Sequence, residues 1–327
     1  MVNESYVKKI KHGGFRSFIK KAVELGIDVE IISKEPVLLK LEYKKKFIFV
    51  SKNNLPIQRR MGNFTRNKET TKLLMEKIGI RTPRGIVSES YKEALPLIRR
   101  KHLSYPLIAK PLDGSLARGV TWDVKSLSEL KKAISFFDKT KSNKKSKFLV
   151  EEMYIGDEFR ILVFNGEIVS CVKKVPATII GDGKSTIKDI IKAFDKKRIK
   201  GFEIKLDKIA RKTLLSNKLT TNSILPAGYA LKLRNNLNMS DGGRCIECTT
   251  EMSNHLKKIC LQAISAAGLN YGGIDLITKN IATSKNDYVI LEINPNPFYN
   301  MHEKPLVEGR GVDVSKKILK YLFPNLK

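Results

Sequence analysis

The chain has 327 residues, of which 62 are Lys or Arg and 33 are Asp or Glu, so its formal net charge is +29. Hydrophobic residues make up 42% of the chain, enough to bury a core, which excludes disorder as the overall class. The length predicts one large domain or two to three smaller ones. The basic residues are 47 lysines and 15 arginines. Because nucleic-acid readers favour arginine for bidentate contacts, this charge indicates an anionic partner without identifying it.

The sequence disfavours a membrane partner and a secreted protein. No stretch approaches ~18 uninterrupted apolar residues, and the first residues lack the apolar region of a secretory signal. In a chain of this size we expect the four cysteines to be reduced thiols; they are Cys171, Cys245, Cys248 and Cys260. These features together predict a cytoplasmic protein.

Residues 1–66 predict a small α/β unit. Apolar residues recur at helical spacing over residues 15–25, and Gly26 supplies the glycine that commonly follows a helix. Strands are expected at 29–32, 37–41 and 47–50, the last two joined by a lysine-rich turn.

Strands and helices alternate through the rest of the chain, which predicts two further units, 67–154 and 155–327. The alternation is typical of an α/β or α+β fold. The expected helices are 68–78, 126–137, 187–194, 253–267 and 314–322, and the expected strands are 105–110, 148–151, 158–164, 167–175, 273–278 and 288–293.

A Gly-Lys-Ser sequence at 183–185 invites comparison with a phosphate-binding P-loop. That motif needs a glycine at position 178, where Thr178 stands. We therefore expect a tight turn that leads into a helix N-cap at Ser185 or Thr186.

Cys245 and Cys248 form a C-x-x-C pair. A structural zinc site would need two more ligands, and only His255 and Cys260 are near, at spacings that match no common finger. Packed thiols are the favoured interpretation.

The most informative signal is a set of polar residues in the last two expected strands. Asp275 lies in one strand and Glu292 in the next, 17 residues on, a spacing suited to adjacent antiparallel strands. Asn294 is two residues beyond Glu292, so these two side chains share a face. Two carboxylates and an amide on one face are either satisfied core groups or ligands for Mg²⁺, which prefers hard oxygen atoms and is usually shared with phosphates.

Two other segments fit nucleotide binding. Lys110 ends a strand directly before the glycine-bearing loop 113–120, and an ammonium group beside mobile backbone N–H groups can hold phosphates without a P-loop. The strand–linker–strand pattern over 148–160 can bind an adenine edge through its backbone. Each segment alone also fits an ordinary surface turn.

Taken in order, these segments resemble the ATP-grasp superfamily of carboxylate–amine ligases, in particular the branch of cyanophycin synthetases and bifunctional glutathione synthetases. The resemblance covers residues 67–327. It is carried by Asn67–Leu74, Ala109–Ser115, Val150–Glu152, Phe159–Val163, Val175–Gly183, Leu233–Asn238, Gly272–Asp275, Glu292–Pro297 and Met301–His302. It implies an ATP-grasp fold whose two α+β subdomains, 67–154 and 155–327, clasp ATP and follow a small N-terminal α/β domain, 1–66. Relatives commonly self-associate, so it also admits a homo-oligomer.

The resemblance implies an ATP site. Lys68 and Lys110 would hold the phosphates, and Glu158 would bind the ribose. The loop over the phosphates would include Asp113, Gly114, Ser115 and Gly119, and the adenine hinge would include Glu151, Glu152 and Tyr154.

The resemblance also implies a catalytic centre. Asp275, Glu292 and Asn294 would bind two Mg²⁺ ions, with Mn²⁺ as a substitute, between the β- and γ-phosphates. Arg160 and Arg234 would hold the substrate carboxylate and the acyl-phosphate, so the catalytic residues would be these two arginines together with Asn294.

The implied reaction is amide formation. ATP phosphorylates a carboxylate, an amine attacks the acyl-phosphate, and ADP and phosphate leave. The expected substrates are an amino acid and an amino acid or peptide. Alternatives are a ligase that modifies a protein-tail carboxylate, a non-catalytic nucleotide-binding module and a basic nucleic-acid-binding protein. The few arginines and the lack of an aromatic/basic motif disfavour specific nucleic-acid binding.

Two departures from the family leave the substrates open. The 327 residues contain no counterpart of the glutamate–cysteine ligase domain or of the second ligase module. Segment 241–250 also departs from relatives that carry an acidic residue after the glycine pair.

Overall fold

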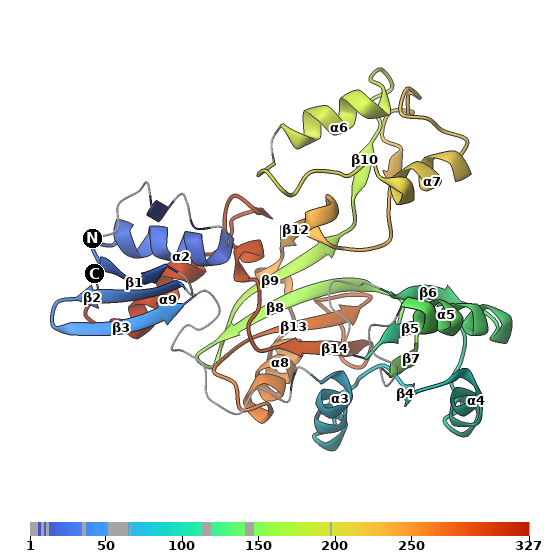
Figure 1. Cartoon of the computed structure of the whole chain (residues 1–327), viewed down its shortest axis with the longest axis horizontal. Helices are drawn as coiled ribbons and strands as arrows, with labels where there is room; N and C mark the ends of the chain where they lie inside the picture. The colour runs from blue at the N-terminus through green and yellow to red at the C-terminus, as the bar shows by residue number, and fades with distance from the viewer. Residues whose placement is uncertain are drawn as a thin grey trace.

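The computed structural model describes residues 6–7, 10, 13–34, 37–51, 65, 67–112, 119–140, 147–196 and 198–326. These residues form three sheets and a projecting lobe (Figure 1). Within the described ranges, no helix has the length and apolar character needed to cross a membrane.

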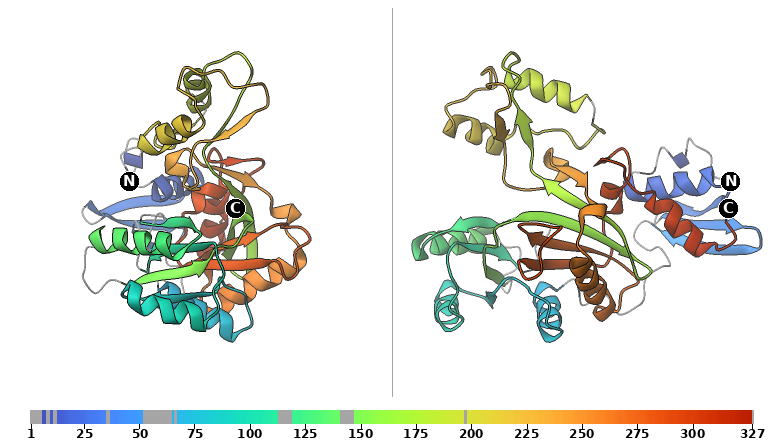
Figure 2. Two further views of the ribbon diagram at one scale, coloured as in Figure 1. Left: turned by 90° about the vertical axis from the view of Figure 1, so that its right-hand side faces the viewer. Right: turned by 180° about the vertical axis from the view of Figure 1, so that it is seen from behind.

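The N-terminal sheet is antiparallel, with strand order β1-β2-β3. Its elements are α2 (Gly13–Glu24), β1 (Asp28–Lys34), β2 (Val37–Tyr43) and β3 (Lys46–Ser51). The C-terminal helix α9 (Val314–Leu322) lies beside α2, and both contribute to one core with this sheet (Figure 2). The predicted helix and strands are confirmed, and the last helix shares a core with the first unit. The three proposed domain boundaries stay a prediction.

A four-stranded sheet, β4-β7-β5-β6, carries two helices on one face. Its strands are β4 (Gly85–Ser88), β5 (Leu107–Pro111), β6 (Thr121–Val124) and β7 (Phe148–Glu152), and its helices are α4 (Tyr91–Arg100) and α5 (Leu127–Thr140). Ile86, Ala109 and Val150 point to the helices, so the residues that alternate with them face the other way. Helix α3 (Lys68–Lys77) begins at Asn67, whose side chain accepts the Thr70 N–H at 3.0 Å.

The central sheet has six strands in the order β14-β13-β8-β9-β12-β15. They are β8 (Asp157–Phe164), β9 (Glu167–Val175), β12 (Arg244–Glu247), β13 (Tyr271–Thr278), β14 (Tyr288–Asn294) and β15 (Val307–Glu308). Helix α8 (Asn254–Ala266) packs on one face against residues such as Ile161, Ile274 and Ile293. The opposite face therefore carries the polar residues that alternate with them.

A lobe with its own apolar core projects beyond the central sheet (Figure 1). Its elements are β10 (Thr178–Ile180), α6 (Ile187–Asp195), α7 (Lys208–Ser216) and β11 (Ala230–Lys232). The predicted turn and cap are confirmed here. Asp182 accepts the Ser185 N–H at 2.7 Å, and Thr186 is the N-cap of α6, accepting the Asp189 N–H at 3.2 Å. Three short 3₁₀ helices complete the described part: η2 (Met239–Asp241), η3 (Thr249–Glu251) and η4 (Tyr299–His302).

The four cysteines are buried and free. The C-x-x-C pair is divided between two cores, because Cys245 and Cys248 pack in different clusters. Cys248 instead lies beside Cys171, with the two Sγ atoms 3.7 Å apart. The predicted packed thiols are confirmed.

Candidate active site

Three neighbouring strands bring the predicted carboxylates into one row. Asp275 on β13 stands opposite Glu292 on β14 and opposite Arg160 on β8. Residues directly opposite each other point to the same face, here the face that α8 does not cover. The predicted antiparallel pairing of Asp275 with Glu292 is confirmed.

Asp275 is the central group of this row. Its two oxygens accept both sides of the Arg160 guanidinium: Nε donates to Oδ1, and Nη2 donates to Oδ2 at 2.9 Å. Burial raises the pKa of Asp275, but the charges of Arg160 and Lys174 outweigh burial and hold that pKa well below its usual range. Asp275 is therefore ionised.

Glu292 has the opposite environment. Burial, together with the adjacent Asp275 carboxylate, raises the pKa of Glu292. Asn294 donates its amide N–H to Glu292 Oε1 at 2.9 Å, which leaves the Asn294 Oδ1 atom available as a ligand.

The donor set fits a hard divalent cation. Within the described residues, no three His, Cys, Asp or Glu side chains gather as a metal site, so the third protein ligand here would be the Asn294 amide. A buried carboxylate, a partly buried one beside it and one amide oxygen match the preference of Mg²⁺ for hard oxygen ligands. The roles of Asp275, Glu292 and Asn294 as ligands stay a prediction.

A second ion pair lies on the same face. Lys174 on β9 stands opposite Glu158 on β8, and its ammonium group contacts the Glu158 carboxylate. Burial lowers the pKa of Lys174, but the charges of Asp275 and Glu158 outweigh burial and raise it. Glu158 has a cation as its partner here, so its predicted contact with a ribose remains to be tested.

Lys174 was not among the predicted site residues. The sequence shows only two adjacent lysines, Lys173 and Lys174, near the end of a strand. Which of them faces Asp275 depends on the register of β9 against β8, and an isolated strand pattern does not give that register.

A triad of charged side chains lies on the face of the four-stranded sheet opposite α4 and α5. Glu151 on β7 is 3% exposed and contacts Lys110 Nζ at 2.5 Å and Lys72 Nζ at 2.7 Å. Burial raises the pKa of Glu151, but the two ammonium charges outweigh burial and lower it. Gly85 stands opposite Glu151, and a Cβ there would lie 2.7 Å from the Glu151 Cγ. Glycine at this position therefore leaves room for the triad.

The triad engages the Glu151 side chain, and the place of Glu151 in an adenine hinge stays a prediction. The Glu151 carboxylate fixes the position of Lys110, the predicted phosphate ligand. Lys72 was missed, although a lysine that follows Lys68 by one helical turn is a visible signal. Lys68 itself lies partly buried at the start of α3.

The remaining hinge and loop predictions are untested. Glu152 Oε1 accepts the Ser104 N–H at 2.8 Å, and the Tyr154 hydroxyl donates to Asp287. Burial and this hydrogen bond raise the pKa of Tyr154 to about 12. Gly119 has a positive φ of 71°. Asp113, Gly114 and Ser115 lie outside the described residues.

Arg234, two residues beyond β11, is buried. Its Nη2 atom donates to the Lys205 carbonyl and to Asp207 Oδ1, each at 2.8 Å. Its Nε atom is buried and has no hydrogen-bond partner among the described residues. A substrate role for Arg234 stays a prediction.

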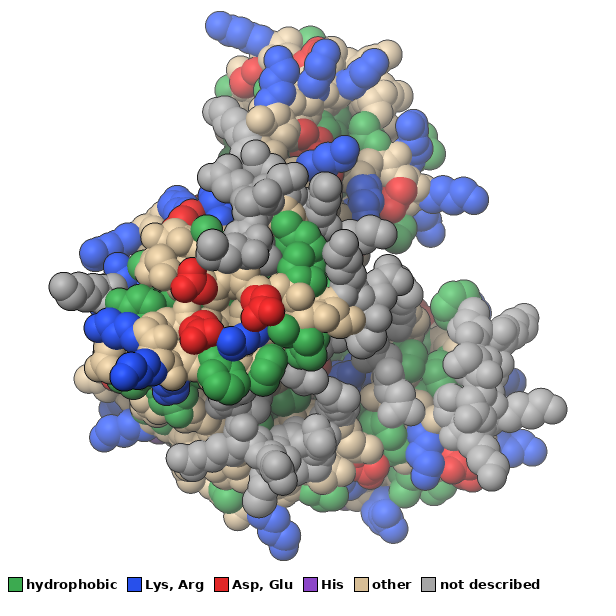
Figure 3. Space-filling view, turned by 60° about the vertical axis from the view of Figure 1, so that its left-hand side comes forward, with side chains coloured by type: hydrophobic (Ala, Val, Ile, Leu, Met, Phe, Trp, Pro, Cys, Tyr) green, Lys and Arg blue, Asp and Glu red, His purple; other side chains and the backbone are tan. Residues whose placement is uncertain are grey.

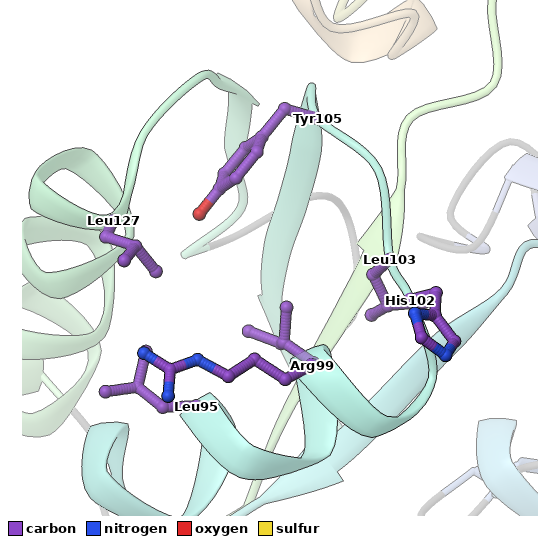
Figure 4. Close-up of a pocket in the computed structure, with 7 residues that line it drawn as sticks. Leu95, Arg99, His102, Leu103, Tyr105 and Leu127 are labelled. Carbon is purple, nitrogen blue, oxygen red and sulfur yellow. The ribbon is translucent and has the colours of Figure 1, made fainter.

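A cavity of about 460 Å³ lies elsewhere, at the end of α4 on the helix-covered side of the four-stranded sheet (Figure 4). Arg99 and Tyr105 point into it from different elements. It is lined by Leu95, Ile98, Arg99, His102, Leu103, Tyr105 and Leu127. None of these is a candidate site residue, so the cavity is distinct from the candidate active site.

The fold and the site together define a class. A short connection between β7 and β8 joins the two sheets. One sheet carries the lysine–carboxylate triad, and the other carries the row of carboxylates and cations. This is the architecture of an ATP-grasp protein.

Comparisons with known proteins agree with this class. The family model described as a RimK-like ATP-grasp domain matches residues 229–322. Cyanophycin synthetase from Trichormus variabilis is 31% identical over 271 residues, which cover 79% of this chain and 29% of that protein. The glutathione biosynthesis bifunctional protein from Enterococcus faecalis is 28% identical over 331 residues, which cover 94% of this chain and 42% of that protein.

A solved structure shares the fold. The bifunctional glutathione synthetase from Pasteurella multocida superposes with a TM-score of 0.73 at 23% identity, over 96% of this chain and 43% of that one. The chain belongs to the ATP-grasp superfamily and is a homologue of cyanophycin synthetases and bifunctional glutathione synthetases. It spans less than half the length of each of these relatives.

Proposed function

We propose that the chain is an ATP-dependent carboxylate–amine ligase that forms an amide through an acyl-phosphate and releases ADP and phosphate. The observation that carries this proposal is the row Glu292–Asp275–Arg160 on one face of the central sheet. Carboxylates for a divalent ion beside a fixed cation suit phosphoryl transfer, in which catalysis is mainly positioning and charge stabilisation.

Each side chain has a defined task in this mechanism. Lys110, fixed by Glu151, holds a phosphate oxygen of ATP. Asp275, Glu292 and Asn294 would hold Mg²⁺, which would supply positive charge to offset that of the phosphates. Arg160 and Lys174 face the same region and stabilise negative charge on the transferring phosphoryl group. Arg234 orients the substrate carboxylate.

The proposed substrates are an amino acid amine and the carboxylate of an amino acid or a peptide. This choice is supported by relatives that are named as cyanophycin synthetase and as a glutathione biosynthesis protein. The acyl-phosphate avoids direct attack on a carboxylate, which is a poor acylating agent. Exclusion of water from the closed site protects this intermediate from hydrolysis.

A screen over amino acids and dipeptides tests this proposal. It measures the release of ADP, with hydroxylamine added to trap any acyl-phosphate. A hydroxamate is expected with at least one carboxylate. Glu292→Gln keeps the shape of the side chain but loses a metal ligand, so we expect turnover to be nearly abolished in a folded protein. Measurable ATP binding with no hydroxamate from any carboxylate would contradict the ligase assignment.

A further inference from the structure

We propose that Arg160 is an internal counter-ion that neutralises Asp275 in the metal-free protein and leaves it when a divalent ion binds. This inference rests on the proposed function, because it takes Asp275 as a metal ligand. It adds a step to that function: the guanidinium group exchanges one partner, the Asp275 carboxylate, for another, the phosphoryl oxygen atoms.

The geometry of the ion pair is the first argument. Arg160 engages both oxygens of Asp275, through Nε on one and Nη2 on the other. A divalent ion bound to the same carboxylate would lie against the guanidinium in a buried region, where repulsion between two cations is weakly screened. The bidentate pair and the metal therefore compete for Asp275.

The charge count around Arg160 is the second argument. Arg160 lies among three carboxylates: Asp275 is directly opposite it, Glu292 is opposite Asp275 on the next strand, and Glu158 is two residues away on the same face of β8. Lys174 forms its ion pair with Glu158, whereas Arg160 is the cation that hydrogen-bonds both oxygens of Asp275. His302 is fully buried, and burial followed by the charge of Arg160 lowers its pKa to about 3. His302 is therefore neutral and does not replace Arg160 as a counter-ion.

Space for the movement is the third argument. Gly273 lies on the same face as Asp275, two residues away. A Cβ on Gly273 would lie 3.2 Å from the Cδ and 3.4 Å from the Nη1 of Arg160. The backbone does not require glycine here, because φ of Gly273 is not positive. A side chain there would crowd the Arg160 stem and the Pro297 Cβ, 2.8 Å away, so glycine leaves the stem without a side-chain neighbour at this position.

Manganese binding without nucleotide tests the competition. In Arg160→Gln the competing cation is gone, so we expect Mn²⁺ to bind about tenfold tighter or more than to the wild type, as measured by the electron paramagnetic resonance signal of free Mn²⁺. Arg244→Gln is the matched control, because Arg244 pairs with Glu308 at 3.1 Å at the edge of the same sheet. We expect Mn²⁺ affinity to be unchanged in this control.

Nuclear magnetic resonance of arginine side chains tests the movement in the wild-type protein. The Nε–H signal of Arg160, assigned by its loss in Arg160→Gln, should shift when Mg²⁺ is added without nucleotide. If Arg160→Gln fails to fold, the signal is assigned instead by specific labelling, and the wild-type titration alone decides.

The outcomes separate this inference from the proposed function. Equal or weaker Mn²⁺ binding in Arg160→Gln, or an Nε–H signal that saturating Mg²⁺ leaves unchanged, would overturn the counter-ion inference alone. An absence of Mn²⁺ binding in both the wild type and Arg160→Gln would overturn the metal site and the inference with it.

Discussion

At the scale of single residues, Glu151 illustrates how one carboxylate fixes two cations. Its side chain is 4% exposed, and its two oxygens contact Lys72 and Lys110 separately. Removal of one member of such a group leaves buried charge without a partner, which is costly. The position of Lys110, and hence the phosphate site, depends on this carboxylate.

Glu151→Gln should therefore destabilise the protein by roughly 3 to 5 kcal/mol at pH 7, because it removes the carboxylate partner of the buried Lys72 and of the partly buried Lys110. The pKa of Glu151 is lowered in the folded state, so its contribution is present above the ordinary value of about 4.5 and is lost as the pH falls further. The difference between variant and wild type should shrink below that pH. Chemical denaturation at several pH values measures it.

Glu152→Gln is the control for this prediction. Glu152 is partly exposed, and a glutamine oxygen can still accept the Ser104 N–H. We expect a change of less than about 1 kcal/mol. A Glu151→Gln effect that is the same at neutral and acidic pH would show that charge is not its cause.

Two adjacent glycines allow a matched test of the site face. A Cβ on Gly273 would meet the Pro297 Cβ at 2.8 Å and the Arg160 Cδ at 3.2 Å, whereas a Cβ on Gly272 would meet the Ile264 Cδ1 at 2.6 Å in the core. Each alanine variant should lose about 1 to 3 kcal/mol of stability from overpacking. Only Gly273→Ala displaces site residues, so we expect at least about a tenfold loss of turnover in that variant alone. Similar turnover in the two variants would contradict the assigned faces.

Sequence reasoning at this scale succeeded where the signal was local. Asp275, Glu292 and Asn294 could be placed on one face because the spacing within and between two neighbouring strands defines it. Lys174 and Lys72 were missed because their partners come from other elements: Glu158 from another strand and Glu151 from 79 residues away.

At the scale of elements, the segment that follows β14 is hydrogen-bonded to the N-terminal unit. Tyr299 in η4 donates its hydroxyl to the Gly14 carbonyl at 3.2 Å and lies 3.3 Å from the Ser315 Oγ. Glu303 accepts the Ser315 N–H at 2.8 Å and the Ser17 hydroxyl. Helices α2 and α9 are thereby connected to the chain that follows Asn294.

Tyr299→Phe should weaken this connection. The buried hydroxyl is lost while the ring stays, so the Gly14 carbonyl loses a donor and stability should fall by about 1 to 3 kcal/mol in chemical denaturation. Tyr321→Phe is the control, because Tyr321 is 43% exposed and its hydroxyl makes only a 3.4 Å contact with Asn270. We expect a change within about 0.5 kcal/mol there. An equal loss in both variants would contradict the role of Tyr299.

The sequence predicted most of the long elements but missed helices α4 and α7 and most of the short strands. Helix α9 was predicted with its observed bounds, and β8 and β9 within one residue. The unpredicted β11 and β12 have three and four residues, too few for a period to emerge. Their pairing depends on contacts across the lobe and the central sheet.

At the scale of the whole molecule, the net charge of +29 lies largely outside the candidate site. The cations Lys72, Lys110, Arg160 and Lys174 each have a carboxylate partner in the site. On the face shown in Figure 3, the described Lys and Arg side chains are scattered rather than merged into one patch. On this face, the described basic residues do not form the single concentrated surface that is typical of a nucleic-acid interface.

The central claim is that ATP activates a carboxylate by transferring its γ-phosphoryl group to it. The most direct test uses the substrate that the hydroxamate screen identifies, with ¹⁸O in both oxygens of its carboxylate. Attack by the amine on an acyl-phosphate leaves one substrate oxygen on the phosphate. Mass spectrometry should therefore find one ¹⁸O atom in each phosphate released with the amide. Unlabelled phosphate, formed in equal amount with the amide, would contradict the account.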